Sequence, residues 1–264
     1  VLDLEAIAAI AKDAHIPLIV DNTLATPYLL QPIKWGADLV VNSTTKFLSG
    51  HGTSMGGVLT ESGKFDWAAD DKFPSMTQPE PAYHGLTFYE TFGDFGFTMK
   101  ARAVGLRDFG PSMAPANAFY TITGIESLPA RMDRHVKNAQ AIAEYLETHP
   151  KVGKVSYAGL SSSQYNDLAK KYMPKGAGSV FTCQLKGGYD SGVKLVEGVD
   201  LFSHLANVGD TRSLILHPAS TTHRQLTDEQ RDAAGAGADV IRLSIGQESI
   251  EDLIHDLDVG LSKV

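Results

Sequence analysis

The stretch Asp38-Leu-Val-Val-Asn-Ser-Thr-Thr-Lys46-Phe-Leu-Ser-Gly-His-Gly-Thr-Ser-Met-Gly-Gly57 joins an apolar segment to a polar, glycine-rich one. Its apolar residues, 39–41, are typical of a short buried strand. Hydroxyl side chains at positions 43, 44 and 45 follow and lead directly into Lys46, and glycines occupy positions 50, 52, 56 and 57. A strand that ends in hydroxyls, one lysine and a flexible loop predicts a site for an anionic or carbonyl-bearing ligand.

The residues on either side of this stretch predict an α/β sheet. Asp3 can cap a helix, residues 18–20 form a second short apolar run that ends at Asp21, and residues 57–60 predict a third strand. Helix, strand, connection and strand at this spacing indicate an α/β fold with a mostly parallel sheet. Ligands of such sheets bind at the carboxyl ends of the strands, and Asp21 and Lys46 both lie just past a strand end.

The remainder of the sequence predicts an irregular excursion rich in aromatic residues, two helices and a second unit. Residues 61–98 are rich in aromatic side chains that we expect to pack together, and residues 98–109 are expected to be helical. A long core-facing helix ends at His149-Pro150. Strands are predicted at 152–156, 179–185 and 239–245, and Thr227/Gln230 and Ser249/Asp252 match the capping-box pattern. We therefore predict a large domain over residues 1–148 and a smaller α+β domain over residues 149–264.

Composition narrows the class of protein. A net charge of -8 and a pI near 5.5 argue against nucleic acid or an anionic membrane as a partner. The single cysteine, Cys183, lies in an apolar run, so we expect a buried inert thiol, no disulfide framework, no metal site and a cytoplasmic location. No apolar run has transmembrane length. Because Val1 begins inside a helical pattern, we expect the chain to be part of a longer protein.

Three interpretations of Lys46 can be compared from the residues alone. It can be an ordinary surface lysine, or it can belong to a Ser-x-x-Lys motif with Ser43 as nucleophile. The second interpretation requires Ser-Asp-Asn and Lys-Thr-Gly motifs, and the sequence contains neither. The third is the lysine of a pyridoxal-phosphate site, with Asp21 holding the pyridine nitrogen protonated and with Ser43 and Thr45 as phosphate donors. This chemistry uses all four residues.

The motifs around Asp21 and Lys46 closely resemble those of one family. Val20-Asp-Asn-Thr-Leu-Ala-Thr-Pro27 and Asn42-Ser-Thr-Thr-Lys-Phe-Leu-Ser-Gly-His-Gly52 resemble the Cys/Met-metabolism family of pyridoxal-phosphate-dependent enzymes. The resemblance continues through Ser112-Met-Ala-Pro-Ala-Asn-Ala-Phe119, Glu126-Ser-Leu-Pro-Ala-Arg-Met132 and Ile241-Arg-Leu-Ser-Ile-Gly-Gln-Glu248, and so extends along essentially the whole chain. It implies the fold-type I transferase architecture.

The resemblance also implies a role for individual residues. Lys46 would bind the cofactor covalently and move protons between substrate carbons and the cofactor, and Asp21 would pair with the pyridinium nitrogen. Thr23, Ser43 and Thr45 would complete the cofactor site. Arg242 would hold the substrate α-carboxylate with its bidentate fork, and Asn207 stands where many relatives have a serine that contacts the same carboxylate.

Several segments, including Pro81-Ala-Tyr-His-Gly-Leu86 and Leu205-Ala-Asn-Val-Gly-Asp210, resemble the O-acetylhomoserine sulfhydrylase branch. That branch implies γ-replacement of acetate by sulfide or a thiol, giving homocysteine or methionine, with His84, His217 and His223 as acid–base candidates. A related γ-lyase, a cystathionine γ-synthase and a catalytically silent chain that keeps only the fold are the alternatives. The resemblance further implies a homotetramer, a dimer of dimers with shared active sites. The family's stacking tyrosine and phosphate-binding Gly-Met turn are not found in this sequence.

Overall fold

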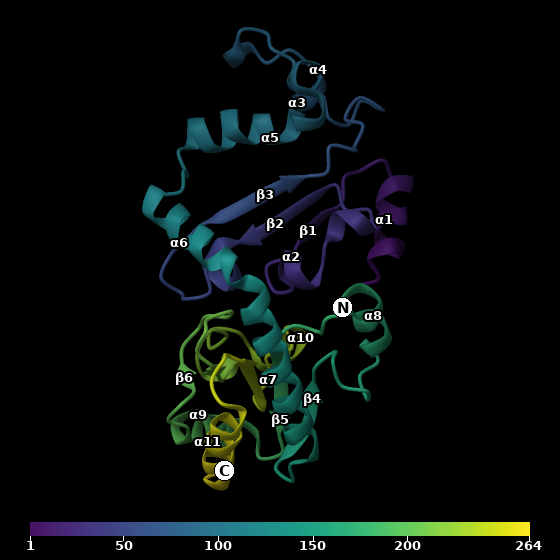
Figure 1. Ribbon diagram of the computed structural model, residues 1–264. Helices are drawn as coiled ribbons and strands as arrows, with labels where there is room; N and C mark the ends of the chain where they lie inside the picture. Colours follow the sequence, from purple (N-terminus) through teal and green to yellow (C-terminus); the bar gives the residue numbers. More distant parts are fainter.

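Strand β2 (Leu39–Ser43) is the central strand of a three-stranded sheet in this computed structural model, which describes residues 1–264 (Figure 1). It pairs in parallel with β1 (Ile19–Asp21) and antiparallel with β3 (Gly57–Glu61). All three predicted strands are present. Strand β1 begins one residue later than predicted because the backbone N–H of Leu18 donates to the Asp38 carboxylate, at 2.9 Å, and not to a neighbouring strand.

Short helical segments precede and connect the first two strands. Helix α1 (Leu4–Asp13) has Asp3 as its N-cap. The carboxylate of Asp3 accepts from the N–H of Ala6 at 3.3 Å, so the predicted cap is confirmed. The connection from β1 to β2 contains α2 (Thr26–Leu29) and the 3-10 turn η1 (Pro32–Trp35). Because this connection is compact, the ends of β1 and β2 lie side by side at one edge of the sheet.

The excursion after β3 forms a small helical bundle, seen at the top of Figure 1. Its elements are α3 (Pro74–Thr77), η3 (Pro81–Tyr83), α4 (Phe88–Phe92), η4 (Gly93–Phe95), α5 (Gly96–Lys100) and η5 (Ala101–Asp108). Aromatic side chains hold it together, as the sequence predicts: Trp67 stacks on Phe97 with ring centroids 5.3 Å apart. Phe88 is buried in the same cluster, which also contains the sheet residue Leu39. The predicted helix at 98–109 corresponds to α5 and η5.

Two consecutive helices, α6 (Pro115–Glu126) and α7 (Leu128–Thr148), lead from the first sheet to the second (Figure 1). Gly124 permits the close approach of α6 to the lysine loop, because a β-carbon there would lie 2.4 Å from the carbonyl oxygen of Leu48. The predicted long helix is α7. Its buried apolar residues at steps of three and four pack partly against β4 (Val152–Ser156) of the second sheet.

The second sheet has the strand order β4-β5-β8-β7-β6, and all neighbours are antiparallel except β6 and β7. The predicted strands are present as β4 (Val152–Ser156), β5 (Val180–Leu185) and β8 (Val240–Ser244). Two further strands, β6 (Ser203–His204) and β7 (Leu214–Leu216), were not predicted, because they are too short to show a periodic pattern. The remaining elements are α8 (Asn166–Tyr172), α9 (Gly188–Gly198), η6 (Pro218–Ser220), α10 (Asp228–Ala233) and α11 (Ile250–Ser262).

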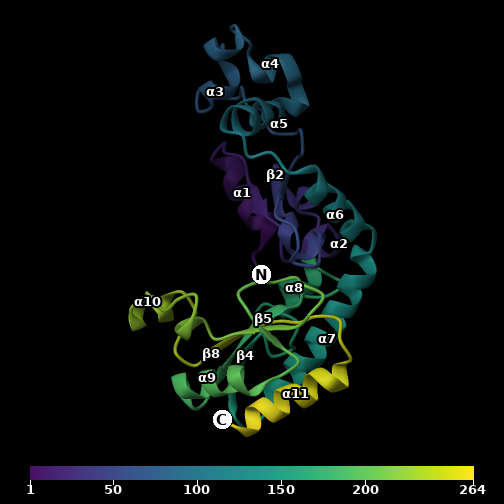
Figure 2. The same ribbon diagram turned by 90° about the vertical axis from the view of Figure 1, so that its left-hand side faces the viewer.

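Helices α9 and α11 lie on the face of the second sheet that is turned away from the first sheet (Figure 2). A core of 21 buried residues fills this space. It includes Cys183, so the predicted burial of this thiol is confirmed, and burial raises the pKa of the thiol to about 12. The opposite face of the sheet is directed at the first unit, and this leaves polar side chains of β8 between the two sheets.

The two sheets match the predicted fold class, an α/β unit followed by a smaller α+β unit. The first sheet was expected to be mostly parallel; of its two strand pairings, β1 with β2 is parallel and β2 with β3 is antiparallel. The Thr227–Gln230 capping box forms both of its hydrogen bonds. Ser249 caps α11 by accepting from the N–H of Asp252, without the reciprocal bond of a full capping box. The domain boundary at residue 148 stays a prediction, since α7 contributes side chains to the cores on both sides of it. No helix combines the length and the apolar character that a membrane span requires.

Candidate active site

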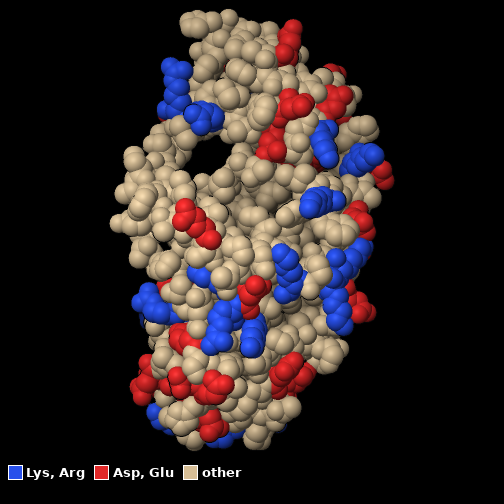
Figure 3. All heavy atoms as spheres, in the orientation of Figure 1, with Lys and Arg blue, Asp and Glu red and all other residues tan.

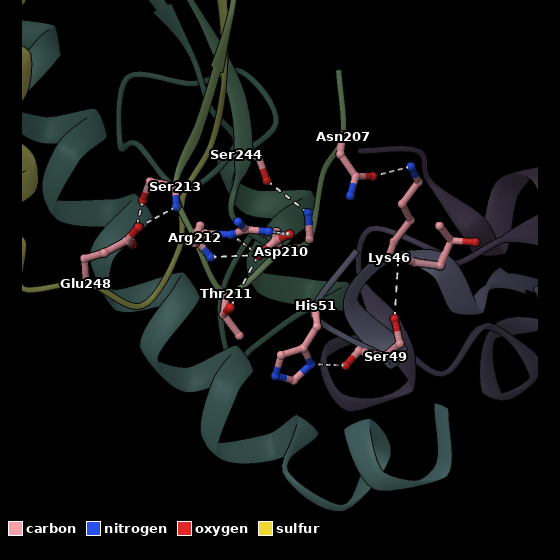
Figure 4. Close-up of polar contacts among 12 residues, drawn as sticks. Lys46, Ser49, His51, Asn207, Asp210, Thr211, Arg212, Ser213, Ser244 and Glu248 are labelled. Carbon is pink, nitrogen blue, oxygen red and sulfur yellow. Dashed lines mark hydrogen bonds and ion pairs between the residues drawn. The ribbon is translucent and has the colours of Figure 1, made fainter. Parts of the chain in front are cut away.

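Lys46 lies in a single wide helical turn, η2 (Thr44–Leu48), directly after β2. Its own backbone, with φ -93° and ψ -132°, interrupts the helical conformation of this turn. The next residue, Phe47, is fully buried and anchors the turn in the core between the two sheets. The Lys46 side chain is half-buried, and its Nζ donates to Oδ1 of Asn207 at 2.6 Å (Figure 4). The lysine of the first sheet therefore contacts a loop of the second.

Arg242 reaches the same loop from β8. Its neighbours Ile241 and Leu243 are fully buried in the second core, so the alternation of a strand directs Arg242 toward the first sheet. Nη2 of Arg242 donates to the backbone oxygen of Asn207 at 3.3 Å. Burial lowers the pKa of the Arg242 guanidinium, which still carries its charge at neutral pH. Asn207 therefore joins the two predicted basic groups, one through its side chain and one through its backbone.

Asp21 and Thr23 lie at the carboxyl end of β1. The carboxylate of Asp21 is exposed and accepts from the N–H of Thr23 at 2.9 Å. The hydroxyl of Thr23 accepts from the N–H of Ser43 at 2.8 Å, and this contact ties the end of β1 to the end of β2. Ser43 uses only its backbone here, which leaves its hydroxyl available to another acceptor. Three of the predicted cofactor residues are therefore neighbours at one edge of the sheet.

Thr45 holds the glycine-rich loop. Its hydroxyl accepts from the N–H of Gly56 at 3.2 Å and lies 3.4 Å from the carbonyl oxygen of the same residue. The adjacent hydroxyl of Thr44 is buried and has no hydrogen-bond partner. A buried polar group without a partner is costly, so its persistence next to Lys46 is consistent with a polar ligand at this place.

These residues fit pyridoxal phosphate by the chemistry of their side chains. A primary amine, a carboxylate and several hydroxyls meet at the carboxyl ends of β1 and β2, where α/β sheets bind ligands. An aldehyde requires the amine, a pyridine nitrogen requires the carboxylate, and a phosphate requires hydrogen-bond donors such as Ser43. The guanidinium of Arg242, which donates to the same Asn207 that accepts from Lys46, suits the carboxylate of an amino acid.

The three candidate histidines lie away from these contacts. His217 is fully buried, with Nδ1 2.9 Å from Oγ of Ser220 and Nε2 2.9 Å from the carbonyl oxygen of Ala238, so both ring nitrogens are already paired. His84 is exposed in the turn after η3, and His223 contacts the neighbouring Thr222. None of them makes a hydrogen bond to Lys46, Asn207 or Arg242. Their use as acid–base groups stays a prediction.

His135, which was not predicted as a site residue, packs against Phe47 next to Lys46. This histidine of α7 is fully buried, and its ring meets the ring of Phe47 edge-on, with centroids 5.3 Å apart. Its Nδ1–H donates to the carbonyl oxygen of Ile245 at 2.6 Å, just beyond β8. The helical period of α7 could have placed position 135 on the buried face, yet the partner of its ring nitrogen lies 110 residues away.

The buried state of His135 predicts a loss of stability in acid. Burial lowers its pKa to about 4, against an ordinary value of about 6.5. Between pH 4 and pH 6.5, therefore, this histidine binds a proton in the unfolded chain but not in the folded chain. The contribution of the neutral ring is complete above pH 6.5. It declines as the pH falls toward 4, by up to about 3 kcal/mol in the free energy of unfolding.

Urea unfolding of the wild type and of His135→Asn at pH 7.5 and pH 4.5 measures this effect. We expect a smaller pH-dependent loss in the variant, whereas His204→Asn, a change to an exposed histidine, should follow the wild type. Equal losses in all three proteins would show that other groups cause the acid sensitivity.

Comparison with known proteins adds a family and several relatives. A family model described as Cys/Met metabolism PLP-dependent enzyme matches residues 1–262. The O-acetyl-L-homoserine sulfhydrylase of Leptospira meyeri is 46% identical over 100% of this chain and 61% of its own length. The homocysteine synthase of Schizosaccharomyces pombe is 49% identical over 98% of this chain and 61% of its own length. The chain therefore spans about three fifths of these relatives.

Solved structures show the same likeness. One is a structure from Campylobacter jejuni of an O-acetylhomoserine (thiol)-lyase with a pyridoxyl-lysine group. It has a TM-score of 0.94 and 40% sequence identity to this chain, and the match covers 99% of this chain and 62% of the Campylobacter chain. The cystathionine γ-synthase of Xanthomonas oryzae, in complex with cystathionine, has a TM-score of 0.81 and 35% identity, covering 100% of this chain and 59% of that one. The likeness in fold therefore extends over both sheets.

Proposed function

The chain belongs to the Cys/Met-metabolism family of pyridoxal-phosphate-dependent enzymes, and on this premise we propose that the full protein catalyses γ-replacement on O-acetyl-L-homoserine. The bond between Cγ and the acetate oxygen breaks, and a bond between Cγ and the sulfur of sulfide or a thiol forms, giving homocysteine or methionine. The observation that carries the proposal is the contact of Lys46 and Arg242 through Asn207, because an amine and a guanidinium meet at the same asparagine. The names of the relatives support this choice of reaction.

Each residue has a definite task in this proposal. When bound, pyridoxal phosphate supplies an electron sink for negative charge at the substrate α-carbon. Lys46 holds the cofactor and carries protons at Cα and Cβ, and Asp21 keeps the ring nitrogen protonated through its negative charge. Arg242 and Asn207 bind and orient the α-carboxylate, which brings Cα within reach of the lysine amine. Ser43 and Thr45, with Thr23, hold the phosphate end.

Product analysis of the full-length protein tests this reaction. We expect homocysteine from O-acetyl-L-homoserine and sulfide, and little release of α-ketobutyrate from methionine. The cystathionine γ-synthase likeness favours a second candidate, in which cysteine is the sulfur donor and cystathionine is the product. Predominant α-ketobutyrate would instead identify a γ-lyase, and a protein that binds no cofactor would be the catalytically silent alternative.

We propose further that the full protein is a cytoplasmic homotetramer, a dimer of dimers with shared active sites. Helix α6 carries four large apolar residues whose exposed fractions lie between 45% and 65%: Phe119, Tyr120, Ile122 and Ile125. Figure 3 shows few charged side chains over this helix, at the left margin of the molecule. Apolar surface of this kind is typical of an interaction site.

A charge on α6 is expected to reduce the size of the assembly. Ile122→Asp in the full-length protein should sediment as a smaller species than the wild type, since association would bury the new carboxylate without a partner. Ile10→Asp, at a residue that is 67% exposed on α1, is the matched control and should leave the assembly unchanged. Identical sedimentation of wild type and Ile122→Asp would remove α6 from the interface.

A further inference from the structure

The loop of residues 205–213, between β6 and β7, is fastened to the backbone beside Lys46. Gly209 has the left-handed φ of +77°, and a β-carbon there would lie 2.7 Å from the backbone nitrogen of Phe47. Its N–H donates to Oγ of Ser244 at 3.0 Å, at the end of β8. The N–H of Thr211 donates to the carbonyl oxygen of Gly50 at 2.8 Å. The loop therefore rests on the segment that carries the lysine and on the strand that carries Arg242.

Asp210 holds this loop with a buried carboxylate. Its side chain is only 3% exposed, while that of its partner Arg212 is 61% exposed. Oδ1 accepts from the backbone N–H of Arg212 at 3.1 Å and from its Nε at 3.2 Å, and Oδ2 accepts from its Nη2 at 3.1 Å (Figure 4). Burial alone would raise the pKa of Asp210, but these hydrogen bonds outweigh it and lower the pKa. Asp210 is therefore a paired anion at neutral pH.

The carboxylate of Asp210 and the carboxamide of Asn207 meet at Gly52. A β-carbon at position 52 would lie 2.9 Å from Oδ2 of Asp210 and 3.1 Å from Nδ2 of Asn207. The two side chains are thus packed against the same point of the lysine loop. Because Oδ1 of Asn207 accepts from Lys46, a shift of the loop around Asp210 would change the distance between the lysine amine and its acceptor.

We propose that Asp210 is a positioning residue that presents the Asn207 side chain to Lys46 and the Asn207 backbone oxygen to Arg242. This proposal rests on the proposed function for its consequence in catalysis, since it assigns Arg242 and Asn207 to the substrate carboxylate. The hydrogen bonds to the Asp210 carboxylate all come from its own loop, from Thr211 and Arg212, and its only contact with the lysine loop described here is the packing against Gly52. Its effect on the site is transmitted through the backbone of residues 207–212.

The test compares Asp210→Ala with Asn207→Ala and with the double variant in the full-length protein. The first readout is the KM for O-acetyl-L-homoserine, which we expect to rise about tenfold in each single variant with a smaller change in kcat. The second needs no substrate. Trace acetylation of Lys46 in the cofactor-free protein should become about three- to tenfold faster, because an amine that no longer donates to Asn207 is free to react.

Asp256→Asn is the matched control. Asp256 is also a buried carboxylate of the second unit, and it accepts from the backbone N–H groups of residues 200, 201 and 202 at 2.8 to 3.0 Å, away from Lys46. We expect this variant to lose stability with no change in the acetylation rate of Lys46. The comparison separates a local positioning effect from general weakening of the second unit.

A double variant that matches the single variants would support the proposal, since coupled residues give non-additive effects. Effects of Asp210→Ala and Asn207→Ala that simply add, or an acetylation rate in Asp210→Ala equal to that of Asp256→Asn, would overturn it. Should Asp210→Ala not fold, Asp210→Asn and Arg212→Lys replace it in the comparison. Both are conservative changes in size, and both weaken the paired hydrogen bonds between the Arg212 guanidinium and the Asp210 carboxylate. If the wild type does not use O-acetyl-L-homoserine, the proposed function fails, and the acetylation rates still decide the role of Asp210.

Discussion

Replacing Lys46 by alanine in the full-length protein is expected to abolish both γ-replacement and the visible absorption of the lysine-bound cofactor. The amine is the only group in this site that can form the covalent link, and it lies 2.6 Å from the Asn207 carboxamide that orients it. Its proton transfers alone are worth roughly 10²- to 10⁴-fold in rate. Loss of covalent attachment adds to this, so we expect no turnover above background. Activity assays and absorption spectra of the reconstituted protein measure both effects.

Two further variants make this result specific. Lys46→Arg keeps a positive charge and should still lack the absorption band, because a guanidinium stays protonated and does not act as a nucleophile at neutral pH. Lys34→Ala, at an exposed lysine of η1, should retain wild-type absorption and rates. A full-length wild type without the band would support the catalytically silent alternative, and activity in Lys46→Ala would refute the assignment of the lysine.

Replacing Arg242 by lysine is expected to raise the KM for the amino-acid substrate by about 100-fold, with a smaller loss in kcat. The guanidinium offers a planar pair of donors that matches a carboxylate, and lysine offers a single point charge. Each lost hydrogen bond to a charged group costs roughly tenfold or more in binding. Arg242 is half-buried, and this strengthens the effect, because its charge is less screened by water than that of an exposed arginine.

Steady-state kinetics with O-acetyl-L-homoserine measure the change, with Arg224→Lys at an exposed position as the control. Visible absorption of the bound cofactor should persist in Arg242→Lys, since Lys46 and Asp21 are untouched. A KM equal to that of the wild type would mean that the substrate carboxylate binds elsewhere.

The pattern of apolar residues was sufficient to predict the strands and helices that carry the site. Strands β1, β2 and β8 were recognisable because each is a short apolar run that ends in polar residues, and α7 because its apolar residues recur every three or four positions. Strands β6 and β7 have two and three residues, too few to show a period, and their pairing depends on the neighbouring strand β8. The chemistry of Lys46 and Asp21 followed from residue type and from their place after a strand.

The residue types and the apolar runs were enough to predict which groups are available: an amine, a carboxylate, hydroxyls and a guanidinium, each after or within a short strand. The packing of the two sheets, in contrast, makes Asn207 the hydrogen-bond partner of Lys46, 161 residues away, and of Arg242, 35 residues away. It also decided that Asp210 is a buried anion and that His135 lies behind Phe47. Local periodicity reports which side of an element is buried, but the partner on that side is set by how the two sheets pack, and no short-range pattern contains that information.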